Sequence, residues 1–271
     1  MEKNSNKEKS FYDHYFDQAD FEVFRFDVGS FCTRKCIIDH ISKTGGNLLE
    51  IGTGISSLIV DLQKFSCTGV DISETTIAKV KSQFATLGIA ADLVVTNAEQ
   101  LPFQDKSFDV IVSAHTLEHV EHDEKVIQEC ARVLKPGGEL ILFVPGRISG
   151  IATQDEFKKY GHFRYYNRQR FIELEHHVQE SLTLKTILFP HKIHNFLWNR
   201  CKHFFRWMNY PLKKWIFRDN KTYELRPAYQ KFLLPLFSKM LNCCDSFTQK
   251  TEKNFCRTEF NVLVKFEKRF L

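Results

Sequence analysis

Leu48-Leu-Glu-Ile-Gly-Thr-Gly54 is a short apolar run that carries an acid and leads into two closely spaced glycines. Seventeen residues after Gly54, a second apolar stretch beginning at Cys67 ends at Asp71. Glycines let the backbone approach a ligand that a Cβ would block, and an acid at the tip of the next strand can accept hydrogen bonds from ribose hydroxyls. The pattern predicts a nucleoside-binding corner but does not say which nucleoside binds there.

The sequence around this corner alternates between strand-like and helix-like patterns. Strands are expected at 47–51, 67–71, 92–97, 108–114 and 139–145, with an apolar run at 182–189 and an alternating stretch at 259–266. Helices are expected after the glycines, where Ile55, Leu58, Ile59 and Leu62 share one face, between Ser73 and Gly88, at 123–134 and near 168–178. Such alternation argues for a Rossmann-like, doubly wound α/β fold with a mostly parallel sheet.

Composition places the chain among ordinary soluble globular proteins, with 43% hydrophobic and 26% charged residues. The polar N-terminus predicts no secretory signal, and no apolar run reaches the roughly 20 residues of a membrane helix. The eight cysteines are scattered, which suggests reduced thiols in a cytoplasmic protein. Neither Cys32–Cys36 nor Cys243–Cys244 has a second half at ligand spacing, so no metal site is expected.

The glycine turn alone does not identify the nucleoside, because it lacks the third glycine typical of dinucleotide sites. Further motifs follow at the ends of successive expected strands, namely Asn97-Ala-Glu-Gln-Leu-Pro-Phe103, His115-Thr-Leu-Glu-His-Val120 and Lys135-Pro-Gly-Gly138. This ordered set resembles the class I S-adenosylmethionine-dependent methyltransferases, particularly the small-molecule group that includes ubiquinone-pathway enzymes. The resemblance implies a seven-stranded sheet whose last strand is antiparallel.

The resemblance also implies a set of residues that hold S-adenosylmethionine. The glycine turn would pass beneath the methionine part, Asp71 would accept the ribose hydroxyls, and His115 would lie near the methionine part. Ile72 can pack on adenine, and Asn97 or Glu99 can meet its exocyclic amine. The expected cofactor residues are Glu50, Gly52, Thr53, Gly54, Asp71, Ile72, Asn97, Ala98, Glu99 and His115.

Candidate residues for the acceptor side follow the fourth expected strand. His119 is the candidate base and Glu118 its orienting partner, although a histidine at a helix start can also simply pack there. A second cluster, His162-Phe-Arg-Tyr-Tyr166, suits either the lining of an acceptor pocket or a solvated turn with packed rings. A base is needed only when the acceptor must lose a proton.

Residues 190–255 interrupt the alternation as a helical, aromatic insertion within a methyltransferase domain formed by 1–189 and 256–271. Residues 1–184 carry 20 Lys and Arg against 27 Asp and Glu, whereas 185–271 carry 18 against 6. The basic insertion can be a cap over the acceptor pocket, a peripheral contact with anionic lipid, or a track for RNA phosphates. Its widely spaced charges disfavour RNA.

The sequence therefore predicts an enzyme that moves a methyl group from S-adenosylmethionine to a small-molecule or lipid-like acceptor. Two alternatives stay open, which are an RNA methyltransferase and a catalytically inactive, cofactor-binding partner subunit. The oligomeric state and the identity of the acceptor do not follow from the sequence.

Overall fold

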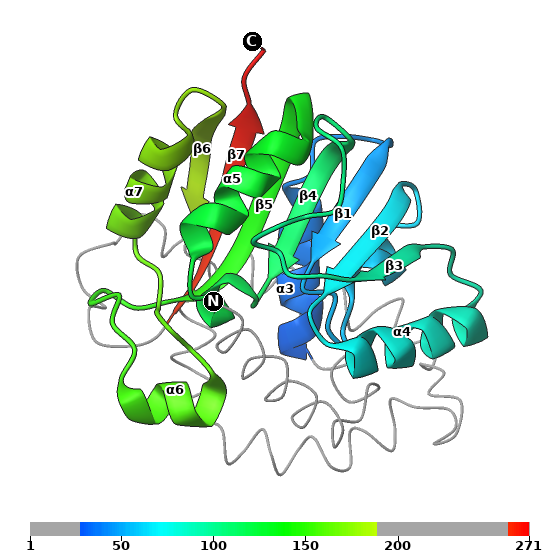
Figure 1. Cartoon of the computed structure of the whole chain (residues 1–271), viewed down its shortest axis with the longest axis horizontal. Helices are drawn as coiled ribbons and strands as arrows, with labels where there is room; N and C mark the ends of the chain where they lie inside the picture. Colours follow the sequence, from blue (N-terminus) through cyan, green and yellow to red (C-terminus); the bar gives the residue numbers. More distant parts are fainter. Residues whose placement is uncertain (1–27, 189–259, 271) are drawn as a thin grey trace.

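The computed structural model describes residues 28–188 and 260–270, which form a twisted sheet covered by helices on both faces (Figure 1). The seven strands lie in the order β3-β2-β1-β4-β5-β7-β6. Their bounds are β1 Asn47–Ile51, β2 Ser66–Asp71, β3 Asp92–Val95, β4 Phe108–Ala114, β5 Leu134–Gly146, β6 Leu182–Leu188 and β7 Phe260–Lys268. Neighbouring strands among the first five pair in parallel, and β7 pairs antiparallel with both β5 and β6. These pairings confirm the predicted architecture.

Alternate residues of the central strands enter different halves of the core. In β5, Leu140 and Leu142 pack in one apolar cluster, while Ile141 and Phe143 pack in the other. A strand buried on both faces needs apolar residues at consecutive positions, which explains the continuous apolar run in this part of the sequence. The sheet is therefore the middle layer of three.

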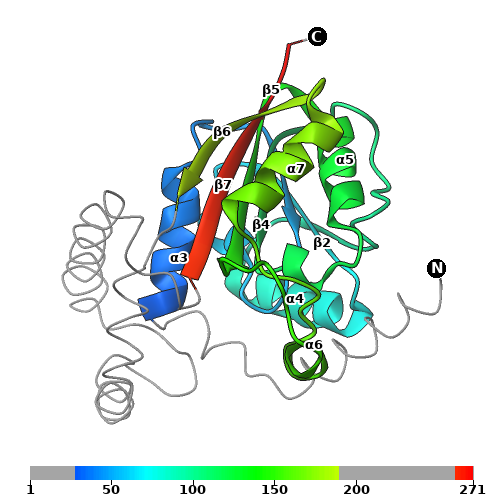
Figure 2. The same ribbon diagram turned by 90° about the vertical axis from the view of Figure 1, so that its left-hand side faces the viewer.

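Helices from different parts of the chain cover the two faces. The helical elements are α3 Val28–Asp39, the 3-10 turn η1 Leu58–Asp61, α4 Glu74–Leu87, the 3-10 turn η2 Leu117–His119, α5 Asp123–Val133, α6 Gln154–Tyr160 and α7 Arg168–Val178. Figure 2 shows α3 on one side of the sheet and α5 and α7 on the other. Residues of α5 and α7 join the first apolar cluster, and residues of α3, η1 and α4 join the second.

The helix expected after the glycine turn is only the short η1. The prediction of a full helix was wrong in length, but the apolar residues that suggested it, Ile55 and Leu58 among them, are buried as expected. The Glu50 carboxylate accepts a hydrogen bond from the Leu58 N–H, so a side chain from β1 satisfies a backbone group in this segment. A tight turn held in this way can satisfy backbone groups without a regular helix.

Three further elements differ from the expectations. β5 begins at Leu134, five residues before the expected start at 139, and pairs there with Phe108 across a bulge. The third strand ends at Val95 instead of reaching Asn97, because the Asn97 side chain accepts a hydrogen bond from the Glu99 N–H and closes a turn there. Helix α6 was not expected, although Thr153 and Glu156 form the reciprocal capping box that begins it. No helix in the two described stretches is long and apolar enough to cross a membrane.

The parallel strands all end at the same edge of the sheet, where α6 also lies (Figure 1). Gly52 follows β1, Asp71 ends β2 and His115 follows β4, so the motifs found in sequence gather at this edge. Ligands of doubly wound sheets bind outside the carboxyl ends of their strands. Residues 190–255, the expected insertion, lie outside the described residues.

Candidate functional site

The glycine turn after β1 has a backbone shape that larger residues resist. Gly52 has a φ of 72° and Gly54 a φ of 50°, both in the left-handed region. A Cβ on Gly52 would overlap the Thr116 side chain, so the turn can approach the chain after β4 only without one. The Gly52 and Thr53 N–H groups both donate to the Val70 carbonyl, which ties the turn to β2. The turn therefore lies against the chain after β4, and the expected approach of a ligand to these glycines stays a prediction.

Glu50 lies under the turn and is almost completely buried. Its Oε2 accepts from the Ser57 hydroxyl at 2.5 Å and its Oε1 accepts from the Leu58 N–H at 2.7 Å. Burial raises the pKa of the Glu50 carboxyl to about 7, although these hydrogen bonds and the charge of Arg34 oppose the rise. Glu50 therefore shapes the turn from below through both of its oxygens.

Asp71 links the ends of the two strands. Its Oδ2 accepts from the Gly54 N–H at 3.0 Å, and its Oδ1 accepts from the Ser73 N–H at 2.9 Å. Ser73 in turn caps α4, because its hydroxyl accepts from the Thr76 N–H. The carboxylate is thus fixed in orientation at the tip of β2.

The residues expected to border adenine lie on neighbouring loops. Ile72 is partly exposed directly after Asp71, and Asn97, Ala98 and Glu99 are partly exposed after β3. The Asn97 side chain closes the turn after β3, and the Glu99 carboxylate lies 3.6 Å from the Lys125 ammonium. These loops place the apolar side chains of Ile72 and Ala98 and the polar side chains of Asn97 and Glu99 at the same edge of the sheet.

His115 follows β4 in a backbone conformation that is unusual for a residue with a side chain. Its φ is 52°, and its N–H donates to the Phe143 carbonyl of the neighbouring strand β5. The imidazole packs edge-on against the Phe143 ring and remains about half exposed. Its Nδ1 lies 3.4 Å from Glu118 Oε1, so His115 also contacts the residue predicted to orient the candidate base His119.

Glu118 and His119 lie together in η2, as the sequence places them. His119 Nε2 is 3.8 Å from Glu118 Oε1, and His119 Nδ1 lies 3.3 Å from the Gly161 carbonyl oxygen. Burial lowers the pKa of His119 in spite of the nearby Glu118 charge. Burial alone would raise the pKa of Glu118, but the contacts with His115 and His119 outweigh it and hold the value below the usual range.

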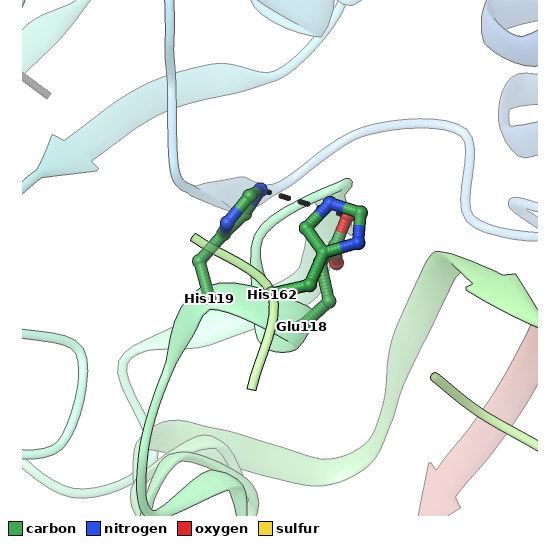
Figure 3. A group of neighbouring side chains, drawn as sticks. All are labelled: Glu118, His119 and His162. Atoms are coloured by element: carbon green, nitrogen blue, oxygen red, sulfur yellow. Dashed lines mark ion pairs between the residues drawn. The ribbon is translucent and has the colours of Figure 1, made fainter. Parts of the chain in front are cut away.

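Only part of the second predicted cluster reaches this site. The ring of His162 packs against that of His119, with centroids 4.8 Å apart (Figure 3). In contrast, the Arg164 guanidinium donates to the backbone carbonyls of Val120 and Glu121, and the Tyr166 hydroxyl donates to the buried Asp123 carboxylate. Arg164 and Tyr166 therefore fix the loop that carries His162.

Sequence reasoning sought metal ligands among cysteines and did not join His162 to the pair in η2. One donor atom each from Glu118, His119 and His162 lies within 4.8 Å of the others. The only signal in sequence was the two separate motifs that carry these residues, and the 43 positions from His119 to His162 hide their proximity.

Part of the chain is similar in sequence to known methyltransferases. Residues 49–142 match a family described as a methyltransferase domain. A phosphatidylethanolamine N-methyltransferase from Cereibacter sphaeroides is 30% identical over 122 residues, covering 44% of this chain and 60% of the relative. The ubiquinone/menaquinone biosynthesis C-methyltransferase UbiE from Bartonella bacilliformis is 40% identical over 107 residues, 39% of each chain. The chain thus spans less than two thirds of the length of these curated relatives.

A solved structure shows that the similarity extends to the fold. Phosphoethanolamine N-methyltransferase 2 from Haemonchus contortus, in complex with S-adenosyl-L-methionine, superposes with a TM-score of 0.60 at 16% identity. The match covers 93% of this chain and 60% of that one. At this low identity the match concerns the fold alone.

Proposed function

Because residues 49–142 match a methyltransferase-domain family, we propose that the chain is a class I S-adenosylmethionine-dependent methyltransferase that transfers a methyl group to a small-molecule or lipid-like acceptor. One observation carries the proposal most directly. The Asp71 carboxylate is held by the Gly54 N–H at the edge where the turn after β1 and the chain after β4 meet. This arrangement combines an acceptor for ribose hydroxyls with a backbone surface that no Cβ obstructs.

The cofactor fits the residues present at this edge. Asp71 would accept the ribose hydroxyls, Ile72 would pack on adenine, and Asn97 with Ala98 and Glu99 would border that ring. Gly52, Thr53 and Gly54 would face the methionine part, with Glu50 holding the turn from below and His115 on the opposite side. When bound, the sulfonium of the cofactor supplies an electrophilic methyl carbon, so the protein needs mainly to position the acceptor.

His119 is the residue we assign to proton transfer where an acceptor must lose a proton. A carbonyl oxygen can only accept, so the contact with Gly161 places the His119 proton on Nδ1 and leaves a lone pair on Nε2. The lowered pKa of His119 favours this neutral form near neutral pH. Glu118 lies on the Nε2 side and would stabilise the imidazolium once a proton has been taken.

Lipid-like acceptors agree best with the names of the relatives. One relative is named for phosphatidylethanolamine and another for ubiquinone and menaquinone, which are apolar molecules with a polar group. We assign the acceptor of this chain to the same broad class. The basic, aromatic residues 190–255 would then cap the acceptor pocket or meet an anionic membrane surface.

Calorimetry with S-adenosylmethionine and its demethylated product S-adenosylhomocysteine tests the core of the proposal. Binding of both compounds is expected. If neither compound binds, the chain is not an active methyltransferase. Transfer of labelled methyl groups into a fractionated cell extract would then identify the acceptor class. Cofactor binding without transfer into any lipid, small-molecule or RNA fraction would indicate an inactive partner subunit instead.

The role of residues 190–255 can be tested by flotation with liposomes. Binding to anionic vesicles at low salt that weakens at high salt would support the membrane contact, because salt screens exposed charges. Binding to neither anionic nor neutral vesicles would favour the cap.

A further inference from the structure

Three potential metal ligands converge at the edge of the sheet where the parallel strands end. Glu118 and His119 come from η2, and His162 comes from the chain that follows α6 (Figure 3). Their donor atoms lie within 4.8 Å of one another, although no ion is present. Two imidazoles and one carboxylate form a donor set that divalent transition ions accept readily.

The two ring nitrogens of His119 have different neighbours. Nδ1 lies 3.3 Å from the Gly161 carbonyl oxygen, and Nε2 lies 3.8 Å from Glu118 Oε1. A backbone carbonyl that accepts from one ring nitrogen is the usual outer-shell partner of a histidine that binds a metal through the other.

The second observation concerns Glu118, whose side chain is 1% exposed. Its Oε1 is shared between His115 at 3.4 Å and His119 at 3.8 Å, while its buried Oε2 has no hydrogen-bond partner among the described residues. A buried carboxylate is costly when it is incompletely paired. An ion in the space between Glu118 and the two histidines would supply the missing interaction.

We propose that Glu118, His119 and His162 bind a divalent transition ion such as Zn²⁺, Mn²⁺ or Co²⁺, with His115 close enough to serve as a fourth ligand. Metal–nitrogen and metal–oxygen distances of about 2.0–2.2 Å require the donor atoms to draw together by roughly an ångström. The half-exposed His115 and the loop that carries His162 can supply that adjustment through side-chain rotation.

The proposal deepens, and rests on, the proposed methyl transfer, because it suggests what the acceptor carries. When His115 does not bind it, an ion held by Glu118, His119 and His162 keeps a position for an exogenous oxygen ligand. The acceptor would therefore present a hydroxyl, enolate or carboxylate oxygen to the ion. The lone pair of His119 would then serve as a ligand, and proton transfer by His119 would be confined to the metal-free protein.

The test is calorimetric titration of the chelator-stripped full chain with Co²⁺ and Zn²⁺, with the absorption spectrum of Co²⁺ as a second readout. One ion per chain is expected, with Co²⁺ bands typical of nitrogen and oxygen ligands. His162→Ala should weaken this binding by more than the roughly 10–100-fold that follows loss of an outer-shell partner. His177→Ala removes an exposed histidine of α7 and should leave it unchanged.

Retained binding of S-adenosylmethionine would show that His162→Ala still folds. Spectra typical of thiolate ligands, or equal affinities for the wild type and His162→Ala, would overturn the metal site and assign the ion to cysteines. No stoichiometric binding would also overturn it. Since cofactor affinity is measured on the metal-free chain, loss of the metal proposal and loss of the proposed methyl transfer are distinguishable.

Discussion

The turn after β1 and the cluster around His119 lie at the same edge of the sheet but are built on opposite principles. In the turn, the carboxylates of Glu50 and Asp71 already accept hydrogen bonds from their own neighbourhood, so the surface offered to a ligand is largely backbone. In the cluster, the side chains of Glu118, His119 and His162 face one another and present lone pairs. We propose that the turn serves cofactor binding and that the cluster serves methyl transfer.

Substitutions in the turn and in the cluster should therefore have different effects. Changes in the turn should act on stability and cofactor affinity, because its side chains hold the backbone in place. Changes in the cluster should act on methyl transfer with little effect on either, because its polar atoms contribute few bonds to the fold. Four substitutions test this division, from the largest expected effect to the smallest.

In the metal-free chain, His119→Ala should produce the largest effect, a fall of about 10²–10⁴-fold in the rate of methyl transfer, the range typical of a lost proton-transfer group. Its affinity for S-adenosylmethionine should stay within about twofold of the wild type, since His119 is not assigned to the cofactor. Rates are measured with the acceptor fraction found by label transfer, and His177→Ala is the matched control. A parallel loss of cofactor affinity would contradict the division.

Gly52→Ala should destabilise the fold by about 2–5 kcal/mol, because a Cβ both meets Thr116 and strains a positive φ. Gly88→Ala is the matched control, since Gly88 has a φ of 66° but nothing lies within 4 Å of its added Cβ. Strain alone should cost about 1 kcal/mol there. The measurement is urea unfolding, and equal losses for the two variants would show that Thr116 does not restrict the turn.

Glu50→Gln should change how stability depends on pH. The pKa of Glu50 is raised in the folded state from 4.5 to about 7, so its contribution is present at low pH and is lost as the pH rises through that window. Wild type should lose about 3 kcal/mol more than Glu50→Gln between about pH 5 and pH 8. Gln can still accept from the Leu58 N–H. Parallel unfolding curves for the two proteins would show that Glu50 does not titrate in this range.

Asp71→Ala should weaken binding of S-adenosylmethionine by about 1–3 kcal/mol, the usual effect of losing a hydrogen bond to a charged group. Asp71→Asn should lose less, because its amide oxygen can still accept from one of the N–H groups at Gly54 and Ser73. Calorimetry on these variants is compared with Asp92→Ala, which changes an exposed acid on the neighbouring strand β3. Unchanged affinity in Asp71→Ala would remove Asp71 from the cofactor site.

Sequence predicted the turn better than the cluster for a physical reason. The turn is contiguous, and its glycines and strand-end acids are constrained by local backbone geometry. The strands could be predicted equally well, because apolar runs such as Leu140–Val144 are required when both faces of a strand are buried. The prediction of a full helix after Gly54 was wrong because the apolar spacing of Ile55 and Leu58 indicates burial, and a 3-10 turn can bury these side chains as well.

The cluster could not be predicted in the same way. His162 reaches His119 because Arg164 bonds to the chain after η2 and Tyr166 bonds to Asp123, contacts that cross more than 40 residues of sequence. The sequence groups both residues with His162, either as the lining of an acceptor pocket or as a solvated turn with packed rings, but in the structure Tyr166 is fully buried and Arg164 donates to backbone carbonyls. Pairings of this kind depend on tertiary packing.

The position of β7 between β5 and β6 has a consequence for synthesis and variation. Among the described strands, β6 pairs only with β7, so Leu182–Leu188 must wait for Phe260–Lys268 to leave the ribosome before this strand partner exists. Leu188, the last described residue of β6, pairs with Leu263 of β7. Segments of different length and character could therefore be exchanged between these two strands while the register of β5, β7 and β6 is preserved.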